Sequence, residues 1–146
     1  MRCIVQRVKK ASVVIDNAEK REINGGLVVL CAFEDEDNSE KIKYVTDKIL
    51  NLRIFTDEND KLNLSLLDVK GELLVVSNFT LYGDCSKGRR PSFVRASAPS
   101  ISEGLYEEFL AELRKYDVKM ETGKFGANML VDISNDGPVT LIVESK

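Results

Sequence analysis

Apolar residues in the first part of the chain fall in short runs that are typical of β-strands. Residues 3–8 (CIVQRV) and 11–16 (ASVVID) are expected to form two strands joined by the basic segment KKAS. Residues 27–33 (LVVLCAF) are continuously apolar, which predicts a strand buried on both faces. Gly25 and Gly26, directly before this run, indicate a turn or a bulge.

Two later segments have apolar residues at helical spacing. The first is expected to begin near Asn38 or Ser39, because both residue types are good N-caps. The second is expected to begin within residues 99–102. The apolar positions that define the two stripes are Ile42, Val45, Ile49 and Leu52, then Leu105, Phe109 and Leu113.

The remaining apolar runs predict further strands. Residues 72–81 (ELLVVSNFTL) give the strongest strand signal, and residues 118–122, 128–134 and 139–145 complete the set. No repeat or linker interrupts residues 1–146, which favours one domain. Strands do not alternate regularly with helices, so we expect an α+β fold of layered β/β/α type, with mainly antiparallel sheets and two amphipathic helices. No glycine-rich nucleotide motif follows a strand, which argues against a Rossmann-type fold.

Composition excludes several kinds of chemistry. The chain has no histidine, so it cannot carry a Ser-His-Asp or Cys-His hydrolase site. Its three cysteines are scattered, so we expect buried thiols and neither a disulfide framework nor a zinc site. The acidic segment at residues 57–61 lacks the spacing of a calcium loop, and no metal is expected. No segment resembles a signal peptide or a membrane span, which predicts a cytoplasmic protein.

The formal net charge is −3, but the positive charges are grouped. Residues 1–10 and 87–95 each carry four cationic side chains and no acid. Such patches can bind phosphates whatever the total charge. Charge alone, however, favours the interpretation that these cations are ordinary solvated surface residues and do not form a binding site.

Residues 77–84 (SNFTLYGD) are the first candidate site. If the strand continues, Asn78 and Thr80 share one face, where they either meet solvent or line a pocket that binds a ligand, with Phe79 available for stacking. Thr80 is the obvious nucleophile, but its hydroxyl needs a base and the chain offers no imidazole. A protein nucleophile is therefore doubtful, and backbone dipoles, water or the substrate itself would have to supply activation.

Residues 134–140 (SNDGPVT) are the second candidate site. Asn135, Asp136 and Gly137 are typical of a hairpin turn between two strands. Pro138 directly after them cannot donate a strand hydrogen bond, and an X-Pro bond adopts cis at low cost. The segment is therefore either an ordinary turn or a rigid wall that rejects a substituent by shape.

These stretches together resemble the D-aminoacyl-tRNA deacylases. The motifs that carry the resemblance are MRCIVQRVKKASVVID, SNFTLYGD, KGRRPSFVRASAP and FGANMLVDISNDGPVT, in the order found in that family. The resemblance implies a homodimer of β/β/α layers, with two sites near the dimer interface and no cofactor. It also implies that aminoacyl-tRNA is the substrate, and that the enzyme hydrolyses the ester of a D-amino acid, or of mischarged glycine, with the terminal adenosine.

The resemblance assigns roles to particular residues. In the family a cis Gly-Pro peptide reaches into the partner's site and excludes L-amino acids, a role that falls here on Gly137 and Pro138, with Arg7 as their support. The residues implied to hold the aminoacyl-adenosine are Ser77, Asn78, Phe79, Thr80 and Leu81, with Phe125, Gly126 and Met129 on the adenosine side. The residues expected to contact the tRNA end are Lys87, Arg89 and Arg90.

One residue departs from the family pattern. Asn78 stands where the family usually has glutamine, which puts the contacts of that side chain in doubt. Family catalysis is attributed to the 2′-hydroxyl of the terminal ribose, which fits a chain without histidine. Two alternatives stay open: a non-catalytic module of the same fold that binds a nucleotide or RNA end, and a structural dimer without a ligand.

Overall fold

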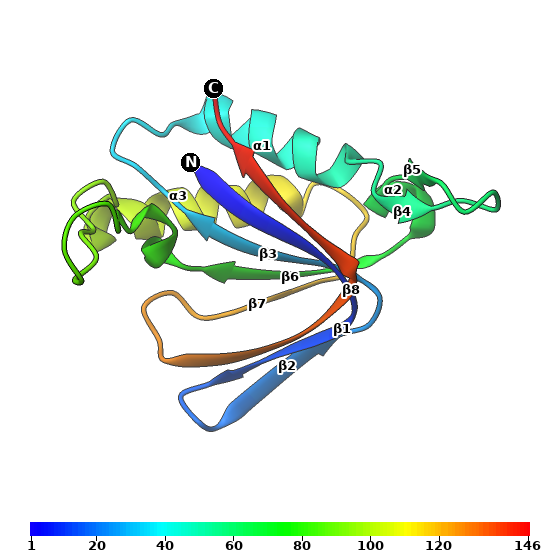
Figure 1. Ribbon diagram of the computed structural model, residues 1–146, viewed down its shortest axis with the longest axis horizontal. Helices are drawn as coiled ribbons and strands as arrows, with labels where there is room; N and C mark the ends of the chain where they lie inside the picture. Colours follow the sequence, from blue (N-terminus) through cyan, green and yellow to red (C-terminus); the bar gives the residue numbers. More distant parts are fainter.

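The sheet is built around β1 (Arg2–Ile15), as the computed structural model of residues 1–146 shows (Figure 1). β1 pairs antiparallel with β2 (Glu19–Ile23), β3 (Gly26–Ala32) and β8 (Met129–Glu144). The two strands predicted within residues 3–16 are therefore one strand. The exposed Lys9 and Lys10 mark an irregularity in its pairing with β8.

Two parallel pairings extend the sheet beyond β3. β6 (Glu72–Ser77) lies parallel to β3, and β7 (Met120–Thr122) lies parallel to β6. Parallel neighbours need long crossovers, and these contain α1 (Ser39–Asn51) and α3 (Pro99–Leu113). The first crossover also holds β4 (Phe55–Thr56), β5 (Leu62–Leu64) and α2 (Leu66–Val69).

Both predicted helices are confirmed. α1 begins after Asn38, whose side chain accepts hydrogen bonds from the backbone N–H groups of Glu40 and Lys41. α3 has no side-chain cap and begins with Pro99, whose missing N–H costs nothing in the first turn. None of the helices is long and apolar enough to cross a membrane.

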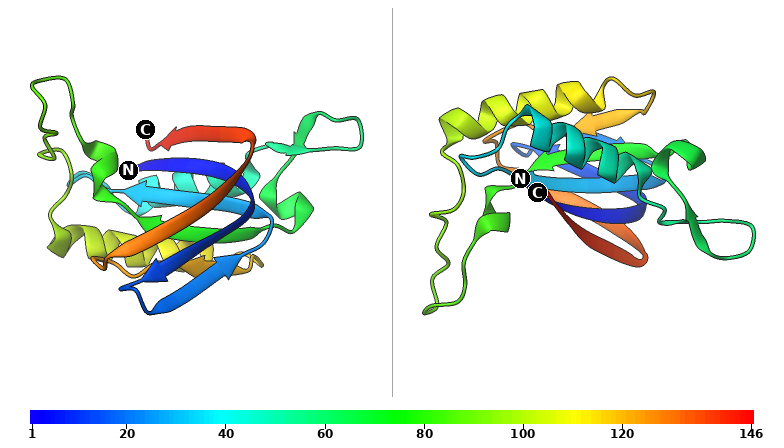
Figure 2. Two further views of the ribbon diagram at one scale, coloured as in Figure 1. Left: turned by 60° about the horizontal axis from the view of Figure 1, so that its bottom comes forward. Right: turned by 90° about the horizontal axis from the view of Figure 1, so that it is seen from above.

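Two apolar cores give the molecule its layers. The larger core lies between the helices and one face of the sheet, where Val45 of α1 and Phe109 of α3 cluster with Val29 of β3. The smaller core joins Val13 of β1 to Leu74 of β6, across two parts of the strongly curved sheet. Seen from above, the helices form one layer over the strands (Figure 2). The predicted β/β/α layering and the α+β class are confirmed.

The strand predicted over residues 72–81 ends early. β6 stops at Ser77, and residues Phe79–Tyr82 form a 3-10 helix, η1. Asn78 caps this helix by accepting a hydrogen bond from the Thr80 N–H, an alternative to strand pairing that asparagine offers readily. The two-residue alternation expected for this segment is therefore wrong.

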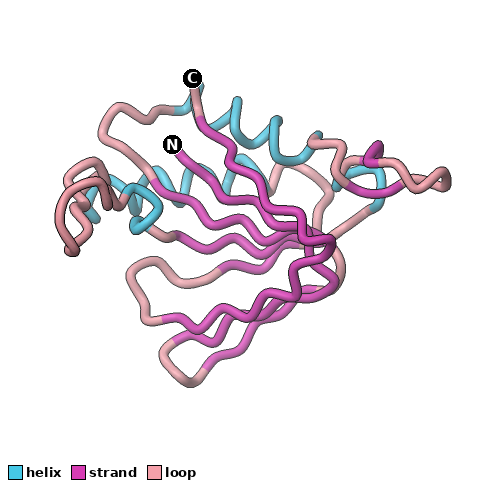
Figure 3. Tube along the Cα trace, in the orientation of Figure 1, coloured by secondary structure: helices cyan, strands magenta, loops and turns pink.

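Long loops project from opposite ends of the sheet (Figure 3). One joins β4 to β5, and the other, residues 83–98, joins η1 to α3. Cys85 in the second loop is exposed, so the expectation that all cysteines are buried is wrong for this residue. Cys3 and Cys31 are buried as expected, because they face the larger core from adjacent strands.

The segment at residues 134–140 is a bulge within β8 and not a hairpin turn. Both halves of β8 run antiparallel to β1, so the chain does not reverse direction. Between the pairs Gln6–Thr140 and Val8–Asn135, β1 advances by two residues and β8 by five. The additional residues of β8 leave the ladder and carry the Gly-Pro pair out of the sheet.

Candidate functional site

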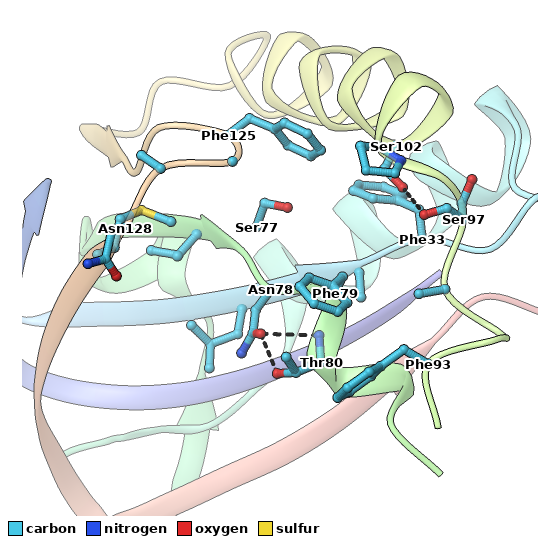
Figure 4. Close-up of a pocket in the computed structure, with 18 of the residues that line it drawn as sticks. Phe33, Ser77, Asn78, Phe79, Thr80, Phe93, Ser97, Ser102, Phe125 and Asn128 are labelled. Atoms are coloured by element: carbon cyan, nitrogen blue, oxygen red, sulfur yellow. Dashed lines mark hydrogen bonds between the residues drawn. The ribbon is translucent and has the colours of Figure 1, made fainter. Parts of the chain in front are cut away.

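A cavity of about 870 Å³ opens at the end of the sheet where β3 and β6 both finish. Its walls come from these strand ends, from η1, from the start of α3 and from the loop between β7 and β8 (Figure 4). Because β3 and β6 are parallel, their carboxyl ends meet at one edge, where binding sites of sheets with helical crossovers commonly lie.

Seven of the residues singled out in the sequence meet at this cavity. They are Ser77, Asn78, Phe79, Thr80, Phe125, Gly126 and Met129. Leu81 is not among the lining residues, and its carbonyl instead accepts a hydrogen bond from Arg2. The other candidates that do not line the cavity are Arg7, Gly137, Pro138, Lys87, Arg89 and Arg90.

Asn78 and Thr80 form one hydrogen-bonded unit on the cavity wall. The Thr80 hydroxyl donates to Asn78 Oδ1 at 2.5 Å, and the Thr80 N–H donates to the same oxygen at 3.3 Å (Figure 4). The Asn78 N–H donates to the Cys31 carbonyl at 2.7 Å, which fixes the unit to the end of β3. The pair is thus held by short-range contacts within the chain, and its free polar atoms face the cavity.

The cavity wall has no ionisable side chain. Of its 21 lining residues 13 are hydrophobic, and the polar ones are only serine, threonine and asparagine apart from backbone groups. The wall formed by this chain therefore presents no general acid or base to a bound molecule. Such a wall can bind a molecule, orient it and exclude water from it.

Phe125 and Met129 are positioned by buried neighbours. The Phe125 ring lies 5.8 Å from the ring of Tyr106 in α3, whose hydroxyl donates to the Val75 carbonyl at 3.2 Å. Burial raises the pKa of Tyr106, so its hydroxyl stays a donor. A Cβ on Gly123 would lie 2.5 Å from the Met129 sulfur, so glycine leaves room for that side chain.

Two residues that were not among the predicted site residues also line the cavity. Phe93 lies on the rim, with its ring edge-on to Phe79 at a centroid distance of 5.2 Å. Ser97 closes another part of the wall, and its buried hydroxyl has no hydrogen-bond partner. Both residues belong to the irregular loop 83–98, where no periodicity marks a buried or functional position.

A stack of charged and aromatic groups fixes η1 to the rest of the protein. The guanidinium groups of Arg2 and Arg95 both lie over the Tyr82 ring, at 4.9 Å and 5.3 Å from its centroid. Arg95 also donates twice to Glu34 Oε1, at 2.8 Å and 3.1 Å. Burial acts to raise the pKa of Glu34, but the Arg95 guanidinium holds it below its ordinary value. η1 and the loop that follows it are therefore anchored at the same place.

The bulge of β8 is held by Arg7 and Asn135. Arg7 donates to the carbonyls of Asp136 at 3.3 Å and of Ile54 at 2.8 Å. The Asn135 amide donates to the carbonyls of Arg7 and Val139. The Gly137–Pro138 peptide bond is cis.

Gly137 leaves no room for a side chain. Its φ of +120° lies in a region that side chains disfavour, and a Cβ there would approach Arg7 Nη2 to 3.1 Å. Arg7 thus lies against the segment that contains Gly137 and Pro138.

The bulge and the cavity lie at opposite ends of the sheet. The bend of β8 is on one side of the molecule, and η1 with the start of α3 is on the other (Figure 1). Residues Met129, Val131 and Ile133 of β8 line the cavity, but neither Gly137 nor Pro138 does. Within one chain the two candidate sites are therefore separate.

The sequence and the fold are both similar to those of known proteins. The family model of D-Tyr-tRNA(Tyr) deacylase matches residues 4–144. D-aminoacyl-tRNA deacylase of Thermosipho africanus is 56% identical over 146 residues, covering 100% of this chain and 98% of that protein. The protein of the same name from Clostridioides difficile is 53% identical over 145 residues, covering 99% and 97%.

Two solved structures share the fold. The c-Myc DNA Unwinding Element Binding Protein matches with a TM-score of 0.93 and 43% identity, over 100% of this chain and 99% of that one. A probable eukaryotic D-amino acid tRNA deacylase matches with a TM-score of 0.83 over 98% of each chain. At 21% identity, this second likeness concerns the fold alone.

Proposed function

Because the chain belongs to the D-Tyr-tRNA(Tyr) deacylase family, we propose that it hydrolyses the ester that joins a D-amino acid to the terminal adenosine of tRNA. Its full-length relatives at 53–56% identity carry the name of this activity. Glycine has no side chain at Cα, so mischarged glycyl-tRNA is a second substrate. Water is the co-substrate, and the products are the free amino acid and a tRNA with a free 3′-hydroxyl.

The cavity suits the aminoacyl-adenosine end of the substrate. Its volume is in the range of sites for one small molecule, and its wall is mainly apolar with a few polar groups. Ser77, Asn78 and Thr80 supply these groups on one side. Phe125 and Met129 form an apolar surface for the adenosine on the other side. Leu81 contributes through the backbone of η1 and not through its side chain.

The observation that carries the mechanism is the absence of any ionisable side chain from the cavity wall. An aminoacyl ester is already activated, and the neighbouring 2′-hydroxyl of the ribose can assist the attack of water on the carbonyl carbon. The bond to the ribose 3′ oxygen then breaks, and that oxygen takes a proton. The protein contributes positioning and desolvation, together with backbone dipoles for the developing oxyanion.

Chirality is selected by a second copy of the chain. Gly137 and Pro138 cannot reach their own cavity without breaking the pairing of β8 with β1. In a homodimer the Gly-Pro segment of the partner enters the cavity and occupies the space that the side chain of an L-amino acid would need. A D-amino acid directs its side chain elsewhere, and glycine has none. The selection is therefore a steric rejection.

Exposed cations provide contacts for the rest of the tRNA end. Lys87, Arg89 and Arg90 are exposed in loop 83–98, which also supplies Phe93 to the cavity rim, and none of them forms an ion pair within the chain. Binding to phosphates through such residues weakens as salt is added.

A deacylation assay tests this function. The protein is incubated with D-tyrosyl-tRNA and L-tyrosyl-tRNA, and the released amino acid is measured. Release from the D-ester alone supports the enzyme. Binding of tRNA without release of either amino acid would support a non-catalytic module of the same fold, the alternative that Asn78 and the missing base favour. The third alternative, a structural dimer without a ligand, requires that the protein does not bind tRNA at all.

A further inference from the structure

Two aromatic rings are exposed at the rim of the cavity. Phe79 and Phe93 are 55% and 38% exposed, although both residues line the cavity. Their ring centroids are 5.2 Å apart, and the ring planes are inclined at 72° (Figure 4). One ring therefore supports the other and leaves an aromatic face open to solvent.

Phe93 is held in place although it lies in a long loop. The backbones of Asp84 and Ser92 form a two-way hydrogen-bonded bridge directly before it. The Ala96 N–H donates to the Phe93 carbonyl, and a Cβ on Gly83 would lie 2.9 Å from the Phe93 ring. The ring is thus packed against the backbone on one side, and a preorganised ring loses little freedom when it binds a partner.

The same loop carries the charge that this aromatic pair would need to bind nucleic acid. The exposed residues Lys87, Arg89 and Arg90 belong to the segment that the bridge between Asp84 and Ser92 closes. Aromatic rings beside a basic segment are the arrangement with which proteins bind single-stranded RNA, where the rings stack on bases and the cations meet phosphates.

We propose that Phe93, supported by Phe79, stacks on the nucleobase that precedes the terminal adenosine of the tRNA. This inference rests on the proposed function, which places the terminal adenosine inside the cavity. A cavity of about 870 Å³ accommodates one aminoacyl-nucleoside, so the next nucleotide lies at the rim. Of the two exposed rings at the rim, Phe93 is the one in the loop that also carries the cations able to meet the adjoining phosphates.

A binding experiment that needs no turnover tests the stacking. Fluorescence anisotropy measures the affinity for a single-stranded oligoribonucleotide ending in CCA and for the same oligonucleotide with an abasic penultimate position. We expect wild type to prefer the intact oligonucleotide by roughly tenfold to a hundredfold, as for one base stacked on an aromatic side chain. Phe93→Ala should bind both oligonucleotides equally, and Phe93→Trp should keep the preference.

Kinetics separate this inference from the proposed function. Phe93→Ala should lose roughly tenfold to a hundredfold in kcat/KM with D-tyrosyl-tRNA, and keep its rate with D-tyrosyl-adenosine, which has no second base. Val94→Ala is the matched control, because Val94 is 91% exposed and does not line this cavity. If wild type hydrolyses neither substrate, the proposed function fails, and the anisotropy result still decides the role of Phe93.

Three results would overturn the inference. Equal losses with D-tyrosyl-tRNA and D-tyrosyl-adenosine would place Phe93 against the terminal nucleoside. Equal affinity of wild type for the intact and abasic oligonucleotides would show that no base stacks there. A change of oligomeric state in Phe93→Ala, measured by light scattering, would assign the ring to contact with another copy of the chain.

Discussion

The Thr80 hydroxyl donates a hydrogen bond to Asn78 Oδ1 at 2.5 Å, and an amide oxygen is too weak a base to remove the proton. A threonine nucleophile needs a group that removes this proton, as histidine does in serine hydrolases. No ionisable side chain lines the cavity that could take that role. The hydrogen bond is therefore structural, and it holds the two side chains together on the cavity wall.

Replacement of Thr80 should leave most of the activity. Thr80→Ala removes one neutral hydrogen bond, worth about 1 kcal/mol, so kcat/KM for D-tyrosyl-tRNA should fall by no more than about tenfold. Single-turnover release of tyrosine measures this, with Thr80→Ser as the control that keeps the hydroxyl. A loss of several orders of magnitude in Thr80→Ala alone would restore the threonine nucleophile.

The pH dependence should show no protein acid or base. Because the lining residues carry no titratable group, log kcat/KM should rise steadily between pH 5 and pH 8 as hydroxide becomes available. The measurement uses stopped reactions corrected for the spontaneous hydrolysis of the ester at each pH. A bell-shaped profile that spontaneous hydrolysis of the same ester does not share, since the α-amino group of the substrate also titrates in this range, would mean that an ionisable protein residue takes part in the reaction.

Loss of Arg7 should weaken the discrimination between D- and L-substrates. Arg7→Ala removes the donors that hold the carbonyls of Asp136 and Ile54, so the Gly-Pro segment becomes loose. Hydrolysis of L-tyrosyl-tRNA should rise by at least about tenfold, since displacing a positioning group by about 1 Å changes rates by up to about a hundredfold.

Arg21→Ala is the control for this prediction. Arg21 also donates to a backbone carbonyl, that of Thr122, but it lies far along the sheet from the bulge. Arg21→Ala should leave the ratio of the hydrolysis rates of D- and L-tyrosyl-tRNA unchanged. An unchanged ratio in Arg7→Ala, with the fold intact by circular dichroism, would remove Arg7 from the selection of chirality.

Replacement of two glycines by alanine should change the thermal stability of the protein in opposite directions. A Cβ on Gly26 would lie 1.9 Å from the Glu72 carbonyl oxygen, where β3 meets β6, so Gly26→Ala should cost about 3 kcal/mol and lower Tm by roughly 6–12 °C. Gly104 lies within α3 with nothing within 4 Å of such a Cβ, and Gly104→Ala should raise Tm by a few degrees. Thermal unfolding followed by circular dichroism measures both. Equal shifts would contradict the close β3–β6 contact.

The helices could be predicted from the sequence because the signals that define them, apolar spacing and capping residues, lie within a few residues of one another. Helical spacing together with the cap Asn38 located α1, and Pro99 located the start of α3. The end of β6 could not be predicted, because the residues after Ser77 have strand propensity. A side-chain cap from Asn78 and a hydrogen bond from its N–H to Cys31 decide the outcome instead. The second of these is a tertiary contact that no local pattern reveals.

The candidate site was predicted in part. The motif at residues 77–80 and the residues Phe125, Gly126 and Met129 come together in one cavity. Asn135 and Gly137 have the residue types of a turn, but the pairing of both halves of β8 with β1 makes the segment a bulge. Phe93 belongs to the family motif KGRRPSFVRASAP, but its loop is aperiodic and assigns it no role, and only the fold brings it against Phe79.

The most direct test of the whole account measures tyrosine release from four esters under single-turnover conditions. These are D- and L-tyrosyl-tRNA, each with a terminal adenosine that carries or lacks the 2′-hydroxyl. The account predicts rapid release from the D-ester with the 2′-hydroxyl, slow release from its 2′-deoxy form, and no release above background from either L-ester. Equal rates for the two D-esters would contradict catalysis by the RNA, and release from the L-esters at a comparable rate would contradict the chiral deacylase itself.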